Sequence, residues 1–457
     1  MRQKTSIFHR VIGDPLPVAV RGEGAYIIDS TGKRYLDACG GAAVSCLGHS
    51  HPKVIAAMQQ QAQTLPFAHT SFFTSEPSED LADLLVERAP VGIDHVYFLS
   101  GGSEAMEAAL KLARQYYVEK GQPKRSQFIA RRQSYHGNTL GALSVSGNQR
   151  RRDQFEPLLM DVEHISPCYP YRDQRPHESA EEYGLRVANE LQSSIEKIGA
   201  ENVIGFVAEP IVGATAGVLV PTPGYFKRIR EICDANDILL ILDEVMCGMG
   251  RTGTYFACEH ENLRPDIITV AKGLAGGYQP LGAMLCSDEI FDTVRSGSGL
   301  FQHGHTYVGH TMACAAALAV QRTIEEEGLL NNIRTIGNVL QRNIKDRFAG
   351  YDNIGDIRGR GLFIGIELVA DRKTKTPLNP ALAIHKIIKR QAMSLGLACY
   401  PSGGTIDGVN GNHILLAPPY FIDHDHVTEI VTKLGYAVDR SLEEIGVISC
   451  LQVSCNA

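Results

Sequence analysis

Three ionisable residues each follow a short apolar run that has the length of a buried β-strand. Glu209 comes directly after VIGFVA, Asp243 directly after ILLIL, and Lys272 shortly after DIITV. Ligands of an open α/β sheet bind outside the carboxyl ends of its strands. The sequence therefore predicts that these three side chains line one crevice, although they lie far apart along the chain.

The segment around Lys272, ITVAKGLAGGYQPLGA, has apolar residues before the lysine and glycines after it. An apolar setting removes water from the ammonium group, which lowers the pKa of a lysine and makes its amine nucleophilic. A lysine before a glycine is more often a solvated loop residue. The prediction of a reactive amine therefore depends on the neighbours of Lys272.

Asp243 stands in LLILDEVMCGMGRTG, 29 residues before Lys272. A carboxylate at the end of a buried strand needs a cationic partner, and a protonated ring nitrogen of a bound aromatic cofactor would supply one. Val245 and Met246 offer apolar contact to a ring face. The alternative is that Asp243 only caps the end of its strand.

A phosphate site is predicted where Gly101, Gly102 and Ser103 precede the helical segment EAMEAALKLAR. The free N–H groups and the dipole at a helix N-terminus favour an anion, and the hydroxyl of Ser103 adds a donor. Gly-Gly-Ser alone is more often a turn. It matches neither the Walker pattern nor the GxGxxG of a dinucleotide fold.

Two further segments carry candidate binding residues. Tyr135 and His136 follow the apolar run QFIA, so that an aromatic ring can cover a flat cofactor, with core packing as the alternative. The segment HGHTYVGHT is the second one, and we expect its Thr306 to bind the phosphate group of a ligand. Its His303 and His305 lack the partners of a zinc site, so we expect no metal.

Strand-length apolar runs alternate with helical segments over much of the chain, which predicts an α/β fold with a mainly parallel sheet. The runs are continuously apolar, which is typical of strands covered by helices on both faces. We assign residues 61–329 to this large domain. Residues 330–457 change to amphipathic helices and short strands, and we expect them to form a smaller α+β domain together with residues 1–60.

Composition restricts the partners of this chain. The formal net charge is −7 and the pI is near 6.2, so neither nucleic acid nor an acidic membrane surface is an expected partner. No run reaches the roughly 18 to 20 apolar residues of a membrane helix. The eleven cysteines show no metal-ligand spacing, and we expect reduced thiols in the cytoplasm.

Several motifs occur in an order that resembles the class III aminotransferases, which depend on pyridoxal phosphate (PLP). This family includes ω-amino acid, ornithine, GABA and diamine transaminases. The motifs are VRGEGAYIIDSTGKRYLD, LGHSHP, SGGSEAMEAALKLAR, YHGNTLGALS, AEPIVG, LDEVMCGMGRTG, AKGLAGGYQPLGA, HTYVGH, RGRGLFIGIEL and APPY. The resemblance implies PLP-dependent transferase fold type I and active sites shared within a homodimer, or within a dimer of dimers. It also implies transfer of an amino group from a primary amine, diamine or ω-amino acid to pyruvate or 2-oxoglutarate.

The resemblance further implies a role for each candidate residue. Lys272 is the Schiff-base lysine and Asp243 the partner of the pyridinium nitrogen. Val245 and Tyr135, the latter followed by His136, pack on opposite faces of the ring. The remaining assignments are Gly102 and Ser103 for the phosphate, Thr306 for the phosphate of the neighbouring subunit, and Glu209 near the mouth of the substrate site.

Two departures from the family pattern concern the substrate. Met246-Cys247 stand where many relatives have Gln-Thr, and Tyr400 stands where amine and diamine transaminases often have an arginine, with a glycine-rich insertion after it. A decarboxylase or an aminomutase of the same fold remains an alternative, because all three use the same electron sink. A catalytically silent binding protein and a nucleotide-binding protein are more distant alternatives.

Overall fold

The computed structural model describes residues 5–13 and 16–447, and its largest sheet has seven strands in the order β4-β10-β9-β8-β7-β5-β6. The strands are β4 (His95–Leu99), β5 (Gln127–Arg131), β6 (Glu163–Ile165), β7 (Val203–Ala208), β8 (Leu239–Asp243), β9 (Ile267–Val270) and β10 (Gly282–Cys286). Only β10 runs against its neighbours in this sheet. The predicted α/β fold with a mainly parallel sheet is confirmed. The sequence did not predict β6, because three residues carry too little pattern.

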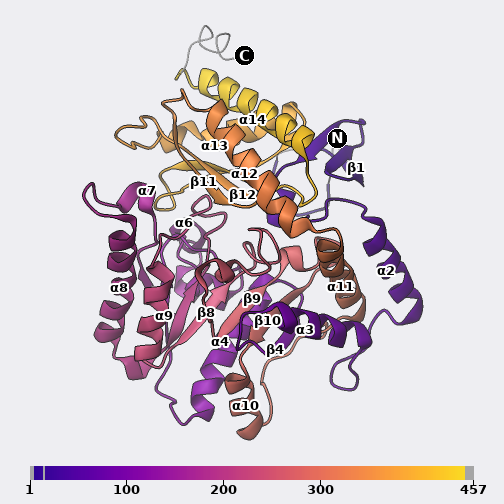
Figure 1. The fold of residues 1–457 in the computed structure, drawn as a ribbon, viewed down its shortest axis with the longest axis vertical. Coiled ribbons are helices and arrows are strands. Elements are labelled where there is room, and N and C mark those ends of the chain that lie inside the picture. Colours follow the sequence, from indigo (N-terminus) through magenta and orange to yellow (C-terminus); the bar gives the residue numbers. More distant parts are fainter. Residues whose placement is uncertain (1–4, 14–15, 448–457) are drawn as a thin grey trace.

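Helices cover both faces of this sheet (Figure 1), which explains why its strands are continuously apolar. On β8, Leu240 and Leu242 pack into one buried cluster, whereas Leu239 and Ile241 pack into another on the opposite face. The first cluster includes side chains of α3 (Glu76–Arg88), α8 (Ala180–Ile198), α9 (Tyr225–Ala235) and α11 (Thr311–Glu326). The second includes side chains of α4 (Gly102–Glu119), α5 (Leu140–Val145) and α10 (Asp288–Ser296).

Two four-stranded sheets lie above the central sheet in Figure 1. One has the order β1-β2-β3-β13, with β1 (Ala19–Glu23), β2 (Tyr26–Asp29), β3 (Arg34–Asp37) and β13 (Leu397–Ala398). The other has the order β11-β12-β15-β14, with β11 (Ile354–Arg360), β12 (Phe363–Leu368), β14 (Tyr400–Gly403) and β15 (Asn412–Leu416). Since β13 pairs in parallel with β3, the N-terminal strands share a sheet with a C-terminal segment. The predicted boundaries at residues 60 and 329 stay predictions.

The remaining helices connect and cover these sheets. The long ones are α2 (Pro52–Thr64), α12 (Leu329–Arg347), α13 (Ile384–Ser394) and α14 (His424–Glu444). The short ones are α1 (Gly40–Ala43), α6 (Gln149–Arg152) and α7 (Pro170–Asp173). Figure 1 places α6 where the central sheet meets the two smaller sheets.

A buried ionic network fixes β11 and β12 against the loop that follows β7. The guanidinium of Arg358 donates to the carbonyls of Ala216 at 2.7 Å and Gly217 at 2.8 Å, and it pairs with Glu367 at 2.7 Å. Glu367 is fully buried and also pairs with Arg172 at 2.6 Å. A fully buried carboxylate is stable only with such cationic partners, and Glu367 has two of them. The network therefore holds the smaller sheets close to the carboxyl ends of the central strands.

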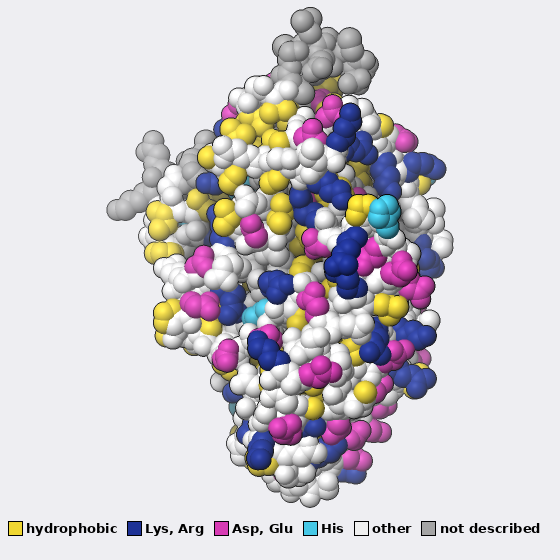
Figure 2. Space-filling model, turned by 90° about the vertical axis from the view of Figure 1, so that its left-hand side faces the viewer, with side chains coloured by type: hydrophobic (Ala, Val, Ile, Leu, Met, Phe, Trp, Pro, Cys, Tyr) yellow, Lys and Arg dark blue, Asp and Glu magenta, His cyan; other side chains and the backbone are white. Residues whose placement is uncertain are grey.

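The surface gives no sign of a nucleic-acid partner on the face drawn in Figure 2, where basic and acidic side chains are interspersed. A basic patch or stripe would be the usual footprint of such a partner. Within residues 5–13 and 16–447, no helix has both the length and the apolarity to cross a membrane.

Candidate active site

The strands β7, β8 and β9 are parallel neighbours, so their carboxyl ends meet at one edge of the sheet. Glu209 directly follows β7, Asp243 is the last residue of β8, and Lys272 comes shortly after β9. The charges of Asp243 and Glu209 both act on the ammonium of Lys272. The structure therefore brings together the three residues that the sequence predicted to share a crevice.

Lys272 is half-buried, and burial lowers the pKa of its ammonium group, against the opposing effect of Asp243 and Glu209. Its backbone has a φ of 49°, in the left-handed region that a lysine rarely adopts. Such a conformation costs about 1 to 3 kcal/mol and is retained where the surroundings impose it. Here the buried side chain of Gln321 on α11 donates to the carbonyls of Gly273 and Leu274 and fixes the turn. This role of Gln321 was not predicted from the sequence.

Asp243 is 4% exposed and accepts two hydrogen bonds. Its Oδ1 accepts from the backbone N–H of Val245 at 2.9 Å, and its Oδ2 lies 2.8 Å from Nδ1 of His136. The sequence placed His136 beside the cofactor but did not predict this bond. Because both oxygens are engaged, the carboxylate has a fixed orientation.

The start of α4 packs against two other parts of the crevice. A methyl group on Gly102 would lie 2.8 Å from a Val245 methyl carbon, so only glycine allows this approach. The hydroxyl of Ser103 accepts from the backbone N–H of Asn138 at 3.0 Å. Gly137 has a φ of 145°, and a methyl group there would lie 2.7 Å from the Ser103 hydroxyl. The predicted phosphate turn, Val245 and the Tyr135–Asn138 turn therefore form one continuous wall.

Two predicted aromatic residues are only partly buried. Tyr135 is half-buried, and the guanidinium of Arg151 lies over its ring at 4.5 Å. Tyr400 is half-buried on β14 and packs against an apolar cluster that includes Cys247 and Phe363. The sequence did not identify Arg151, which stands among three consecutive arginines.

Thr306 is exposed on the surface of the single chain. No hydrogen bond joins its side chain to the other predicted site residues within the part of the chain that the structure describes. Among the predicted site residues, Thr306 is the one that is exposed, whereas the others are at least partly buried.

Glu209 is 4% exposed, and burial raises its pKa to about 7. The charges of His136 and Arg131 oppose this rise, and that of Asp243 adds to it. Arg131 is also buried and places Nη2 4.0 Å from Oε2 of Glu209. Glu209 is thus an interior residue of the crevice, close to Lys272 and Asp243.

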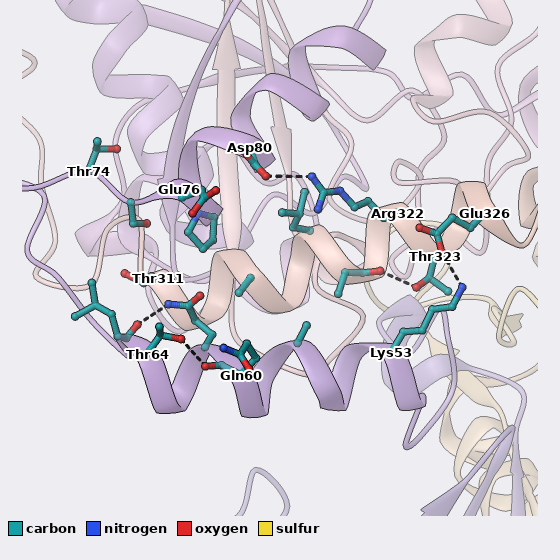
Figure 3. Close-up of a pocket in the computed structure, with 18 residues that line it drawn as sticks. Lys53, Gln60, Thr64, Thr74, Glu76, Asp80, Thr311, Arg322, Thr323 and Glu326 are labelled. Carbon is teal, nitrogen blue, oxygen red and sulfur yellow. Dashed lines mark hydrogen bonds and ion pairs between the residues drawn. The ribbon is translucent and has the colours of Figure 1, made fainter.

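A separate cavity of about 660 Å³ lies between α2, α3 and α11 (Figure 3). Lys53 pairs with Glu326 at 2.7 Å and Arg322 with Asp80 at 3.1 Å on its walls, so these charges are already matched. None of the predicted site residues lines this cavity. In the described ranges, no group of three or more His, Cys, Asp and Glu side chains is arranged to hold a metal ion.

Comparison of the sequence with known proteins identifies the family to which this chain belongs. The sequence model of the class III aminotransferases matches residues 10–438, so the chain belongs to this family of PLP-dependent enzymes. It is 41% identical over 441 residues to an uncharacterized aminotransferase of Schizosaccharomyces pombe, with 96% of each chain covered. It is 36% identical over 449 residues to a chloroplastic γ-aminobutyrate transaminase 3 of Solanum lycopersicum, covering 96% of this chain and 84% of the relative.

The fold of this chain also matches that of a solved structure. The ω-transaminase of Pseudomonas jessenii in complex with PMP has a TM-score of 0.89 and 33% identity, with 95% of this chain and 94% of that chain covered. The expectation of fold type I and of an aminotransferase is confirmed, and PLP is the cofactor of the family.

The residues of the crevice fit PLP on their own chemistry. Lys272 is a desolvated amine, Asp243 a fixed carboxylate, and the start of α4 a turn in which Gly102 allows close approach. Three buried polar atoms nearby, Oε2 of Glu209, Nε2 of His136 and Oγ1 of Thr269, have no hydrogen-bond partner among the described residues. Buried polar atoms are normally paired, so this crevice is suited to a polar ligand.

The raised pKa of Glu209 predicts how the stability of the cofactor-free protein depends on pH. In the unfolded chain this carboxyl releases its proton near pH 4.5, whereas in the folded chain it does so near 7. The folded state therefore binds more protons across this interval, and the free energy of unfolding falls as pH rises through it. Glu209→Gln removes this contribution. Relative to wild type, the variant should gain up to about 3 kcal/mol between pH 5 and pH 8, as measured by urea unfolding.

Glu326→Gln is the matched control, because its exposed carboxylate has a lowered pKa from its bond with Lys53. A lowered pKa affects stability only at more acidic pH, so this variant should follow wild type from pH 5 to pH 8. Parallel curves for wild type and Glu209→Gln would contradict the assignment of a raised pKa to Glu209.

Proposed function

We propose that this aminotransferase moves an amino group from a primary amine, a diamine or an ω-amino acid to a keto acid, pyruvate or 2-oxoglutarate. The observation that carries the chemistry is the desolvated amine of Lys272 beside Asp243 and Glu209 at one edge of the sheet. The donor class is supported by the names of relatives and neighbours, which include γ-aminobutyrate transaminases and ω-transaminases. A decarboxylase, an aminomutase or a silent binding protein has no such support.

Bound PLP supplies an electron sink for the negative charge that develops at the reacting carbon of the substrate. We assign covalent attachment of the cofactor to Nζ of Lys272. Once released from the cofactor, this lysine has a depressed pKa and would act as a neutral amine, moving the proton between the substrate carbon and the cofactor carbon as general base and acid. Asp243 keeps a proton on the ring nitrogen, and His136 holds its carboxylate in the required orientation.

The walls of the crevice supply the remaining cofactor contacts in this proposal. Gly102 and Ser103 bind the phosphate at the start of α4, where helix N–H groups are free. Val245 and Tyr135 pack on opposite faces of the ring. The direct contact of Gly102 with Val245, and of Asn138 with Ser103, supports the placement of these groups around one flat ligand.

On the substrate side we propose Glu209 and Tyr400. Oε2 of Glu209 has no hydrogen-bond partner among the described residues and lies close to Lys272, so it suits an amine on the far end of a donor. Tyr400 packs against apolar side chains and brings no charge to the pocket. A donor without an α-carboxylate fits such a surface better than an ordinary α-amino acid.

We also propose a homodimer, or a dimer of dimers, in which Thr306 reaches the phosphate of the neighbouring subunit. Thr306 is exposed, and the adjacent Tyr307, 60% exposed, contacts the ring of Phe67. Exposed Phe72 and Phe73 follow in the same N-terminal segment as Phe67. Exposed apolar side chains close together mark interaction surfaces. A cytoplasmic location is supported by the nine described cysteines, which are all free and buried.

Lys272→Ala is expected to fold and to bind PLP through the phosphate site, but to lose the covalent link and the proton-transfer group. Turnover should fall by about 100- to 10,000-fold or more, the range that general acid–base groups contribute. The measurements are the absorption spectrum and borohydride reduction followed by peptide mapping. Reductive labelling of another lysine in wild type would reject the assignment.

Asp243→Asn should reduce turnover by about 100-fold or more, because a neutral amide cannot stabilise a protonated ring nitrogen. The side chain keeps its shape and its acceptor for the N–H of Val245. The change in melting temperature should therefore be small compared with the loss in kcat. Near-normal kcat would leave Asp243 with a structural role only.

The donor class is tested with a diamine, an ω-amino acid and an α-amino acid, each assayed with pyruvate and with 2-oxoglutarate. Wild type should show the highest kcat/KM with donors that lack an α-carboxylate. Glu209→Gln should alter donor preference more than PLP affinity, and Tyr400→Phe should leave the preference largely intact. A strong preference for the α-amino acid that neither change affects is the result that excludes this donor class.

A further inference from the structure

The keto-acid acceptor of the proposed reaction always carries a carboxylate, so the pocket needs a cation even if the donor does not. Tyr400 is uncharged and packs among apolar side chains, so β14 does not supply it at this position. Buried Arg131 is engaged with Glu209, where its guanidinium donates to the backbone carbonyl and lies 4.0 Å from the carboxylate. Another group must therefore neutralise the acceptor.

The three arginines of α6 differ in what they contact. Arg152 is buried, donates to the carbonyls of Leu143 and Ser146, and pairs with Glu156 at 3.5 Å. Arg150 is exposed. Arg151 is half-buried, and within the described residues its guanidinium has neither an ion pair nor a hydrogen bond. Arg151 is thus the member of this group that is partly shielded from water and still free to bind an anion.

The position of Arg151 relates it directly to the crevice. Its guanidinium lies over the ring of Tyr135 at 4.5 Å, and the next residue, His136, bonds to Asp243 at 2.8 Å. The positive charge of Arg151 also acts on Lys272: burial is the main cause of the lowered pKa of that lysine, and Arg151 lowers it further. The stacking on Tyr135 therefore places this cation beside the part of the crevice that holds His136 and Asp243.

Two contacts hold Arg151 in this place. Stacking on an aromatic ring orients a planar guanidinium and leaves its N–H edge available. In addition, the glycine-rich segment 404–411 packs against α6, since a methyl group on Gly408 would lie 3.0 Å from the backbone nitrogen of Arg150. The same segment is fixed to Gln133, whose side-chain amide donates to the carbonyls of Gly404 and Thr405.

We propose that Arg151 binds the carboxylate of the keto-acid acceptor, with Tyr135 as its stacking platform and segment 404–411 as the support of α6. A guanidinium meets a carboxylate through two parallel hydrogen bonds, which gives orientation as well as affinity. Arg151 is a specificity-determining residue in this assignment. The inference rests on the proposed function, because it assumes an amino donor whose binding depends little on the charge of Arg151.

The test compares Arg151→Gln, Arg151→Lys and the matched control Arg150→Gln, all as PLP-loaded holoenzymes. Titration calorimetry with butyrate, an unreactive monocarboxylate, measures anion binding apart from turnover. Stopped-flow absorbance measures the two half-reactions, with a carboxylate-free amine and then with pyruvate or 2-oxoglutarate. Arg151→Gln should weaken butyrate binding and slow the keto-acid half-reaction by roughly 10- to 100-fold, as expected for a lost hydrogen-bonded charge.

The amine half-reaction should change much less than the keto-acid half-reaction in Arg151→Gln. Arg151→Lys should recover part of the butyrate affinity, because it keeps the charge but not the two-bond geometry. Arg150→Gln should stay within about twofold of wild type in both measurements, since a surface charge contributes little.

Unchanged butyrate affinity in Arg151→Gln would overturn the assignment, and so would an equal loss in Arg150→Gln, which would indicate only diffuse charge. If wild type transfers no amino group from carboxylate-free amines, the proposed donor class fails. The butyrate titration still decides the role of Arg151 in that case.

Discussion

The crevice depends on holding a lysine side chain partly out of water within reach of two carboxylates. An ammonium group loses hydration when it is buried, and the pKa of Lys272 falls for this reason although Asp243 and Glu209 oppose the fall. Without the carboxylates, burial would lower the pKa of the amine still further. If the site were open to water, the amine would remain protonated. The arrangement of β7, β8 and β9 as parallel neighbours sets this balance, because it places the three residues at one edge of the sheet.

Backbone contacts then make the crevice rigid. Asp243 cannot rotate freely, because one oxygen accepts from the N–H of Val245 and the other bonds to His136. Gly102 brings the start of α4 against Val245 with no space for a methyl group. Lys272 adopts a left-handed backbone that Gln321 supports from α11. The residues that face the proposed ligand are thus held in place by one another and, at the Lys272 turn, by Gln321.

Transamination by this family requires the same pocket to accept two different molecules in turn. The interior part of the crevice, with Lys272 and Asp243, serves both half-reactions. The rest of the pocket is used differently by the two half-reactions in our proposal, since Tyr400 and the buried Glu209 face the donor whereas Arg151 meets the carboxylate of the acceptor. The stacking of Arg151 on Tyr135 connects the two parts, because the proposed ring-face residue is also the platform of the proposed anion-binding residue.

Local patterns in the sequence were enough to predict the class of fold and the meeting of Glu209, Asp243 and Lys272 at one edge of the sheet. Strand-length apolar runs ending in Glu209, Asp243 and Lys272 predicted a parallel sheet with one crevice, because local patterns report burial and strand direction. The order of motifs predicted the family. Gly102 and Ser103 were predicted as a phosphate site because glycines directly before a helical segment indicate a helix N-terminus.

Contacts between residues far apart in the chain became visible only in the folded structure. The bond of His136 to Asp243 joins residues 107 positions apart, and the support of the Lys272 turn by Gln321 crosses 48 and 47 positions. Arg151 looked the same as Arg150 and Arg152 in the sequence, since three consecutive arginines have no pattern that separates them. Their different roles follow from the direction in which each side chain leaves α6, toward solvent, toward Tyr135 or into the interior. Such directions depend on the packing of segments that are far apart in the chain, which no local pattern of residues specifies.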